Sequence, residues 1–493
     1  MSLVARSIKN TSAPINRIPP DVLSLIPDYC ETNEDLVTLT HVCRSWRETF
    51  ISRASLWTSL DCTNLDQTNV YLQRSKGSPL NIHLMAYRCN CICRNALLLT
   101  LPHIRRLKTL AVFGSLCVRK LNARFNSPAP LLEELRIKVH RDRLPSVEST
   151  VFGGNLSSLR ELHLYGVLTD LPWRNLANLT AFDFRRVPGN KISVTQLLDF
   201  FEDAPRLREI KLRDSLPYSS NAPSERVVSL PHLRLLRIDA QPVHSILLNH
   251  LEIPTGAFIT LDFNLSGERS PILDYLPRSI DNLNNISRIT SVNLDFRSGV
   301  TIWFSGSNGD LYVSGGWVLR RPIPPILEHE ILPSLDKFHI STTESLAIAH
   351  YGGLAHTKIE ESDAYQTLFL MKNLRILTLT YCADLSFIFA LNPDRNTSNA
   401  VICPRLGELV LYIQEPGEES CVDELLEMAK GRASKGVKLS TVMILCPRDL
   451  IPAEKVLELR KYVSYVDYRL VNAASTWVNL LRQLNHHGYD IYW

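Results

Sequence analysis

One short pattern recurs along most of the chain: a leucine, an apolar residue three positions later, and another apolar residue two positions after that. Residues two apart on a strand point to the same side, so the last two positions predict a strand with one buried face. The pattern begins at Leu107, Leu132, Leu159, Leu179, Leu207, Leu233, Phe258, Ile289, Leu335, Leu374, Leu406 and, more weakly, Leu439. We therefore expect many similar strands in succession.

The spacing of this pattern narrows the expected fold. Successive starts lie 20 to 31 residues apart up to Ile289 and 32 to 46 residues apart after it. Leucine-rich repeats have periods of about 20 to 29 residues. Apolar residues at helical spacing from Val194 to Phe201, and from Val422 to Ala429, predict helices between strands. The array thus resembles a degenerate leucine-rich repeat, and we expect an irregular, curved α/β solenoid with insertions in its second half.

The length of the chain agrees with an array. Its 493 residues exceed the roughly 250 to 300 residues that one hydrophobic core can serve. The composition, 45% hydrophobic and 21% charged, is that of a folded chain. The net charge of +4 is small for this length and does not by itself indicate a nucleic-acid partner.

The first sixty residues have a different, helical pattern. Ile18 is followed by Pro-Pro-Asp, and both proline and an acidic residue favour the first turn of a helix. Further along, apolar residues at relative positions 0, 3, 7, 10 and 14 predict one helical stripe across about four turns, which a kink near Val42 could interrupt. These residues are Leu36, Leu39, Cys43, Trp46 and Phe50.

This segment carries a second resemblance. Ile-Pro-x-Asp-Val-Leu, then Asp-Leu-x-x-Leu-x-x-Val-Cys-Arg-x-Trp-Arg, then Leu-Trp, resembles the F-box motif in the form found in large fungal, basidiomycete-like families. The resemblance implies a three-helix module that docks on a Skp-type adaptor and thereby on the cullin scaffold of a ubiquitin ligase. The adaptor-binding residues that it implies are Ile18, Pro19, Leu23, Leu36, Leu39, Val42, Cys43 and Trp46.

The size of the module leaves two interpretations open. About 45 residues bury too little surface to be comfortably stable alone, so the apolar faces need a partner. If that partner is an adaptor, the chain is a substrate-recognition subunit of a Skp-cullin-F-box ligase that acts in protein degradation. If it is the first strands instead, the helices only cap the array, and the chain is a ligase-independent scaffold.

The strand positions that alternate with the buried pairs form a second candidate surface. In the first half they carry six cations and two anions, Asp183 and Asp239, and further along they become Asp262, Asn264, Asn293, Asp295 and His339. The basic half predicts capture of an acidic or phosphorylated protein segment, because guanidinium groups bind phosphate bidentately. The alternatives are a solvated face with cross-strand ion pairs, or a solenoid that binds RNA. The predicted substrate-binding residues are Arg136, Lys138, His163, Tyr165, Arg185, Lys211, Arg213 and Arg237.

No catalytic constellation stands out, and we expect neither enzymatic activity nor a cofactor. Cys89, Cys91 and Cys93 form a C-x-C-x-C run that would share one strand face, but metal sites favour wider pairs, so no metal is expected. The start of the chain has no apolar leader segment, and no apolar run is long enough for a membrane span. We therefore expect reduced thiols and a location in the cytoplasm, the nucleus or both.

These expectations divide the chain into four parts. Residues 1–13 form a disordered tail and residues 14–60 the F-box-like helical domain. Residues 61–447 form the solenoid, with a β-hairpin insertion at about 299–316, where Asn308-Gly309 lies between alternating apolar residues. Residues 448–493 form a C-terminal cap.

Overall fold

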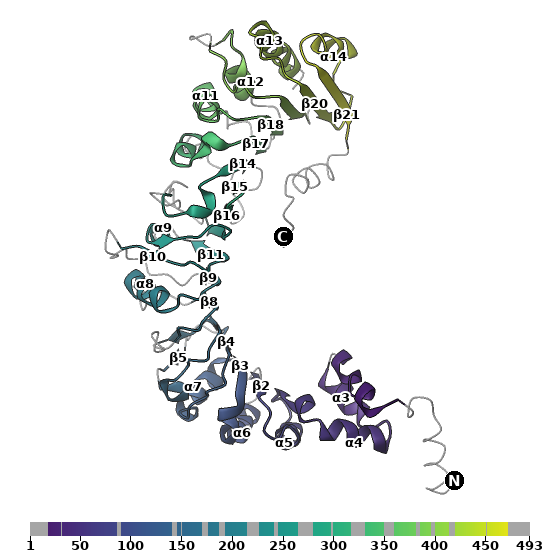
Figure 1. Cartoon of the computed structure of the whole chain (residues 1–493), viewed down its shortest axis with the longest axis vertical. Helices are drawn as coiled ribbons and strands as arrows, with labels where there is room; N and C mark the ends of the chain where they lie inside the picture. Colours follow the sequence, from purple (N-terminus) through teal and green to yellow (C-terminus); the bar gives the residue numbers. More distant parts are fainter. Residues whose placement is uncertain are drawn as a thin grey trace. The chain divides into compact units, whose positions relative to one another are not determined.

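The computed structural model describes residues 18–30, 32–85, 90–140, 145–148, 150–169, 176–186, 193–213, 226–240, 245–264, 280–296, 299–316, 331–349, 359–380, 385–395, 400–413, 420–449 and 451–471. The expected tail, residues 1–13, lies outside these ranges. The chain divides into two compact units, residues 1–221 and 222–493. In the first unit, helical segments come before the strands and then alternate with them along the sequence; in the second unit, strands and helical segments alternate. The strands of each unit lie side by side (Figure 1).

The first unit opens with short helical segments and continues into parallel strands. The helical segments are α2 (Pro20–Leu23), η2 (Ile26–Tyr29), α3 (Asn33–Leu39), α4 (Arg44–Ser52) and η3 (Ala54–Trp57). The strands, in spatial order and all parallel, are β1 (Ser59–Asp61), β2 (Leu80–Met85), β3 (Leu107–Phe113), β4 (Glu134–Lys138), β6 (Glu161–Tyr165), β8 (Ala181–Arg185) and β9 (Glu209–Arg213). A small separate sheet pairs β5 (Ser146–Val147) with β7 (Leu168–Thr169).

The recurring apolar pattern builds the core of this unit. Leu110, Leu135, Leu162, Phe182 and Ile210 are register partners on five successive strands and are at most 1% exposed. The intervening helical segments are α5 (Leu65–Arg74), α6 (Asn90–Thr100), η4 (Leu101–Arg106), α7 (Ser115–Arg124), η5 (Val151–Gly154) and α8 (Val194–Asp203). The apolar face of α8 is buried, and Ser193 caps it in a reciprocal capping box.

The second unit contains a longer run of strands, one of which is antiparallel. In spatial order they are β11 (Leu235–Ala240), β13 (Phe258–Asn264), β16 (Gly309–Gly316), β15 (Gly299–Gly306), β14 (Ile289–Asp295), β17 (Ser345–Ala349), β18 (Ile376–Thr380), β19 (Glu408–Tyr412), β20 (Thr441–Cys446) and β21 (Tyr465–Leu470). A two-residue pair joins β10 (Val228–Ser229) to β12 (Leu251–Glu252). Only β15 runs against its neighbours among the described strands of this sheet.

The helical segments of the second unit lie between these strands in sequence. They are α9 (Ser245–Leu248), η9 (Asn284–Ile286), η10 (Leu335–Lys337), η11 (Ile340–Thr342), α11 (Glu361–Leu370), α12 (Ser386–Leu391), α13 (Ser420–Ser434) and α14 (Ala453–Leu459). Helices α11 to α14 follow one another along one side of strands β17 to β21 (Figure 1). Arg432 of α13 is fully buried there and donates hydrogen bonds to the carbonyl oxygens of Ile402 (2.8 Å) and Cys403 (3.0 Å).

Strands β15 and β16 form a hairpin around Ser307–Asp310 that is part of the sheet. Its two strands lie between β13 and β14 in the sheet. Because β15 is antiparallel to both β16 and β14, strands β13, β16 and β14 all run in the same direction. The turn packs closely on β13: Gly309 has φ +130°, and a Cβ atom there would lie 2.5 Å from the carbonyl oxygen of Ala257. The buried Asn285 amide donates to the carbonyl oxygens of Ala257 (3.3 Å) and Asp310 (3.0 Å), which joins the two segments.

The pattern that begins at Leu335 does not form a strand. Leu335 and Ile340 are buried in η10 and η11, and the strand of this segment is β17, five residues further on. In a 3₁₀ helix, residues three apart lie on the same side. The first interval of the pattern can therefore occur in a 3₁₀ turn as well as in a strand. His339 therefore does not lie on a strand face. At the end of the chain, α14 and β21 add another helix and parallel strand, and residues 472–493 lie outside the described residues.

We predict that Gly309→Ala destabilises the hairpin by about 1–3 kcal/mol, since alanine disfavours positive φ and its methyl group meets a backbone oxygen. Hydrogen exchange should rise in β15 and β16 and stay unchanged in the first unit. Gly77→Ala is the control, because nothing lies within 4 Å of its added methyl group. Equal exchange in both variants would contradict the prediction.

Candidate functional site

The N-terminal helices pack around a small aromatic core. Leu23, Trp46 and Phe50 are buried together, and the Trp46 and Phe50 rings meet edge to face at 5.6 Å. The partly buried residues packed against them are Ile18, Ile26, Leu39, Cys43 and Leu56. Helix α3 begins at a capping box between Thr32 and Asp35, which satisfies the first free N–H groups of the helix.

The apolar stripe from Leu36 to Phe50 lies on two helices and not on one. Helix α3 ends at Leu39, and α4 begins after Cys43, whose backbone is extended (φ −158°, ψ 175°). The Arg47 side chain donates to the carbonyl oxygen of Thr40 at 2.9 Å and bridges the break. The break near Val42 turns this residue outward, so 52% of its surface is exposed.

The residues that the resemblance implies for adaptor binding fall into three groups. Leu23, Leu36 and Trp46 are at most 6% exposed and therefore hold the module together. Ile18, Leu39 and Cys43 are half-buried, and Pro19 and Val42 are exposed. Whether these residues contact an adaptor remains a prediction, but the first group offers little surface to another chain.

An apolar surface remains open on this module, and most of its residues were not predicted from the sequence. Val22, Leu25 and Tyr29 follow one another at intervals of three and four residues and are 52%, 53% and 87% exposed; Val42, in the break between α3 and α4, is 52% exposed. We call these four residues the outer apolar patch. Val22, Leu25 and Tyr29 alternate in sequence with the buried Leu23 and the half-buried Ile26. This segment therefore has apolar residues both on the side that packs in the core and on the exposed side.

Trp57 connects the module to the first strands. Its ring is fully buried, stacks edge to face on Tyr71 at 4.9 Å, and has the Arg74 guanidinium 4.3 Å above it. The indole N–H donates to the carbonyl oxygen of Phe50 at 2.9 Å. Helix α4 is thereby fixed to α5 and to the sheet that follows.

A second candidate surface is the charged face of strands β4, β6, β8 and β9. Three rows of side chains alternate with the buried pairs on this face, because residues i, i+2 and i+4 share one side. The first row is Glu134, Glu161, Ala181 and Glu209; the second is Arg136, His163, Asp183 and Lys211; the third is Lys138, Tyr165, Arg185 and Arg213. The acidic first row was not predicted, because it lies before the two positions of each strand that alternate with the buried pair of the sequence pattern.

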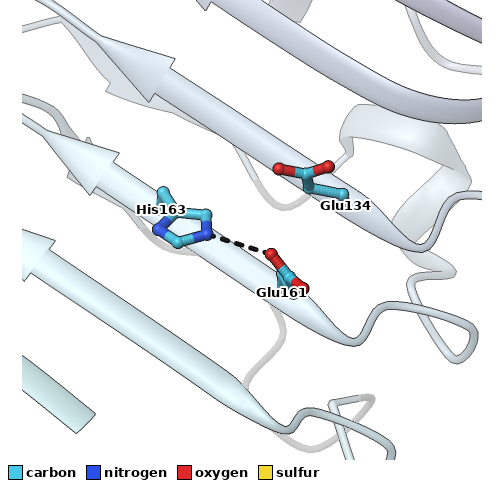
Figure 2. A group of neighbouring side chains, drawn as sticks. All are labelled: Glu134, Glu161 and His163. Carbon is cyan, nitrogen blue, oxygen red and sulfur yellow. Dashed lines mark hydrogen bonds and ion pairs between the residues drawn. The ribbon is translucent and has the colours of Figure 1, made fainter. Parts of the chain in front are cut away.

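Side chains of the first two rows pair with one another, and Figure 2 shows three of them, Glu134, Glu161 and His163, with the contact between His163 and Glu161. Arg136 forms ion pairs with Glu134 and, at 3.9 Å, with Glu161; His163 Nε2 lies 3.4 Å from Glu161. Glu134, Glu161 and His163 could offer three ligand atoms to a metal ion, all within 4.8 Å of one another. The Arg136 guanidinium already provides a positive charge to both carboxylates, so we interpret the group as an ion-pair network.

Asp183 lies at the centre of this network. It accepts two hydrogen bonds from Arg185, at 2.5 and 2.7 Å, and His163 Nδ1 lies 3.6 Å away. Burial acts to raise the pKa of the Asp183 carboxyl, but the bonds from His163 and Arg185 outweigh it and lower the pKa. Lys211 likewise pairs with Glu209 at 3.1 Å. Two of the predicted substrate-binding cations, Arg185 and Lys211, are therefore already bound to carboxylates.

The remaining positive charge gathers around Tyr165, at the carboxyl ends of the strands. Lys138 and Arg186 both lie 5.5 Å from the centre of the Tyr165 ring, and the His140 ring lies 5.1 Å away. Lys138 has no acidic partner among the described residues. Arg213 is the last residue of β9, and its carbonyl oxygen accepts a hydrogen bond from the backbone N–H of Arg186 at 2.7 Å. We call Lys138, Tyr165, Arg186 and Arg213 the basic edge.

Arg237, the last of the predicted cations, belongs to the second unit. It forms ion pairs with Asp262 at 2.7 Å and Asp239 at 3.6 Å. It therefore does not belong to the basic edge, and its surroundings are acidic.

The cysteines differ in part from the expectation of reduced thiols. Cys117 is disulfide-bonded, with its partner outside the described side chains, whereas Cys30, Cys43, Cys62, Cys403, Cys421 and Cys446 are not in disulfide bonds. Burial raises the pKa of the Cys62 and Cys403 thiols to about 12. In the C-x-C-x-C run, Cys91 and Cys93 lie on helix α6, not on a strand, and Cys89 lies outside the described residues. Within the described residues, no helix is long and apolar enough to cross a membrane.

We predict that Asp183→Asn destabilises the first unit by about 1–3 kcal/mol at neutral pH. Because the folded-state pKa is lowered, the stabilisation is present above the ordinary value of 3.8 and disappears as the pH falls through the folded-state pKa. Urea unfolding of both proteins should therefore differ near neutral pH and converge in acid. The control Glu209→Gln should change stability by less than about 1 kcal/mol, since its ion pair is half-exposed. A pH-independent difference would contradict this assignment.

Comparison with known proteins adds one finding about the chain. No curated protein matches the chain. Residues 15–63 match a family model described as F-box-like. The match spans α2 to β1, and so includes the aromatic core, the outer apolar patch and Trp57. This F-box-like domain supports the assignment of the chain as an F-box protein.

Proposed function

We propose that the chain is a substrate-recognition subunit of a Skp-cullin-F-box ubiquitin ligase. The observation that carries the proposal is the outer apolar patch on a domain that matches the F-box-like family. A module of this size with apolar residues more than half exposed is expected to bind another chain. The match to the F-box-like family supports docking on a Skp-type adaptor. Through that adaptor the chain would join the cullin scaffold.

Within this proposal, the strands hold the target and contribute no chemistry of their own. The alternation of parallel strands and helices, with pattern starts 20 to 31 residues apart in the first part, supports a degenerate leucine-rich-repeat solenoid. Such a scaffold would accelerate ubiquitin transfer by raising the effective concentration of the target near the ligase's loaded partner. We place this function in the cytoplasm or nucleus.

We predict that replacing the outer apolar patch abolishes adaptor binding without unfolding the module. Leu25→Glu with Val42→Glu should weaken binding of a purified Skp-type adaptor by about 30-fold or more, because each charge would be buried in the interface. Leu457→Glu is the matched control: this leucine is also exposed, at 59%, but lies on α14 in the second unit. Wild-type affinity in the double variant, with an unchanged circular dichroism spectrum, would refute the proposal.

A variant of the core tests a different step. Leu36→Ala with Trp46→Ala should also abolish adaptor binding, but through loss of packing, because both side chains are buried. Its melting temperature should fall, whereas that of the patch variant should not. The two variants thus separate contact residues from residues that shape the module.

The target-binding part of the proposal concerns the basic edge. Lys138 and Arg186 flank the Tyr165 ring and are exposed, so an acidic or phosphorylated segment could bind there without breaking the Asp183 network. We expect Lys138→Ala with Arg186→Ala to lower the affinity for a phosphopeptide by about tenfold. Lys211→Ala, which removes a cation that is already paired, is the control. An equal loss in both proteins would place the acidic segment elsewhere.

A further inference from the structure

The second unit carries a polar and aromatic surface on strands β13, β16, β15 and β14. Thr260, Tyr312, Trp303 and Asn293 are register partners in one row across these strands. Their sequence neighbours Leu261, Val313, Ile302 and Leu294 are at most 1% exposed on the opposite, core side. The row therefore lies on the face of the sheet that the core does not use.

Two aromatic rings occupy the centre of this row. Trp303 and Tyr312 are half-buried, and their rings meet at 6.2 Å with an angle of 82°. Among the described residues, no cation lies over either ring, in contrast to Tyr165 in the first unit. Aromatic ring faces attract positive groups, and neither of these two rings receives one from the part of the chain that the structure describes.

Next to the rings, two buried polar atoms have no hydrogen-bond partner. Asn293 is only 9% exposed, yet its Oδ1 accepts no hydrogen bond; the Nε1 of Trp303, its register partner, donates none. Such atoms are rare in folded proteins because an unpaired buried polar group is unfavourable. Asn285 in the same unit donates its amide Nδ2 to two carbonyl oxygens, and its Oδ1 is likewise without a partner. Asn293 Oδ1 therefore lacks a hydrogen-bond donor, and Trp303 Nε1 lacks a hydrogen-bond acceptor.

The charge of these four strands is negative. They contain Asp262, Asp295 and Asp310 and no lysine or arginine. Burial raises the pKa of the Tyr312 hydroxyl, hydrogen bonds with Ser314 and Thr301 oppose this, and the carboxylates Asp262 and Asp295 raise it further. Both carboxylates are thus close enough to influence the ring hydroxyl. Arg237 reaches Asp262 from β11, with a guanidinium that also pairs with Asp239.

We propose that this surface binds a lysine or arginine side chain of an extended protein segment. The cationic group lies against Trp303 and Tyr312, donates to Asn293 Oδ1, and is attracted by the carboxylates. A backbone carbonyl of the same segment accepts the Trp303 N–H. A peptide supplies both the donor and the acceptor, whereas a free polyamine supplies only donors. This inference names a class of target for the proposed function and rests on that function for its biological role.

Binding can be measured with the full-length chain and labelled oligo-lysine and oligo-arginine peptides, by fluorescence anisotropy. The net charge of +4 opposes non-specific binding of such peptides, so affinity must come from a local site. We expect Asn293→Leu and Asp262→Asn each to weaken binding by about tenfold or more. Trp303→Phe keeps a ring but loses the donor, and should weaken peptide binding while leaving spermine binding unchanged.

Two controls make the outcome decisive. Glu209→Gln removes a carboxylate from the strand face of the first unit and should leave peptide binding unchanged. Equal binding of an oligo-glutamate peptide, or wild-type affinity in folded Asn293→Leu and Asp262→Asn proteins, would overturn the proposal. Spermine binding that matches peptide binding in every variant would also overturn it. Adaptor binding by the same preparations is measured separately, so loss of that activity alone counts against the proposed function and not against this site.

Discussion

Pairing of neighbouring parallel strands is the interaction on which the remaining structure depends. Because each strand repeats the same in-and-out alternation, one face of the sheet becomes a continuous column of buried leucine, isoleucine and phenylalanine. A shift of one residue in any strand would move its apolar side chains to the other face. The core column therefore fixes which residues reach the opposite face, and that face is free to differ from strand to strand.

This freedom gives the two units different surfaces on the same kind of framework. In the first unit, the rows run from acidic Glu134, Glu161 and Glu209 to the basic edge. In the second, they begin with aspartates and aromatic rings and become apolar at β19 and β20, where Val410, Tyr412 and Leu445 are buried together. The outer apolar patch belongs to helices that are not part of either sheet face. The residues of the patch and those of the two strand faces can therefore change independently in sequence.

Much of this arrangement was predictable from the sequence. The leucine pattern predicts β3, β4, β6, β8 and β9 because a buried strand leaves a period of two, and the F-box-like helices are marked by Trp46 and its spacing. Details that depend on neighbouring segments were not predictable. The partner of Arg185 is a carboxylate two residues away on its own strand, and nothing in the sequence distinguishes this from an unpaired cation. The exposed Leu25 and Tyr29 were missed because an open apolar residue has the same local pattern as a buried one.

The hairpin between β13 and β14 has a consequence for how such a chain can lengthen. An inserted single strand would reverse the direction of every strand after it, or force a new crossover, but a pair restores the original direction. Each later strand therefore presents its carboxyl end at the same edge as before. Growth by two strands at a time is thus a way to add new surface residues, here Trp303 and Tyr312, without rebuilding the part of the sheet that follows.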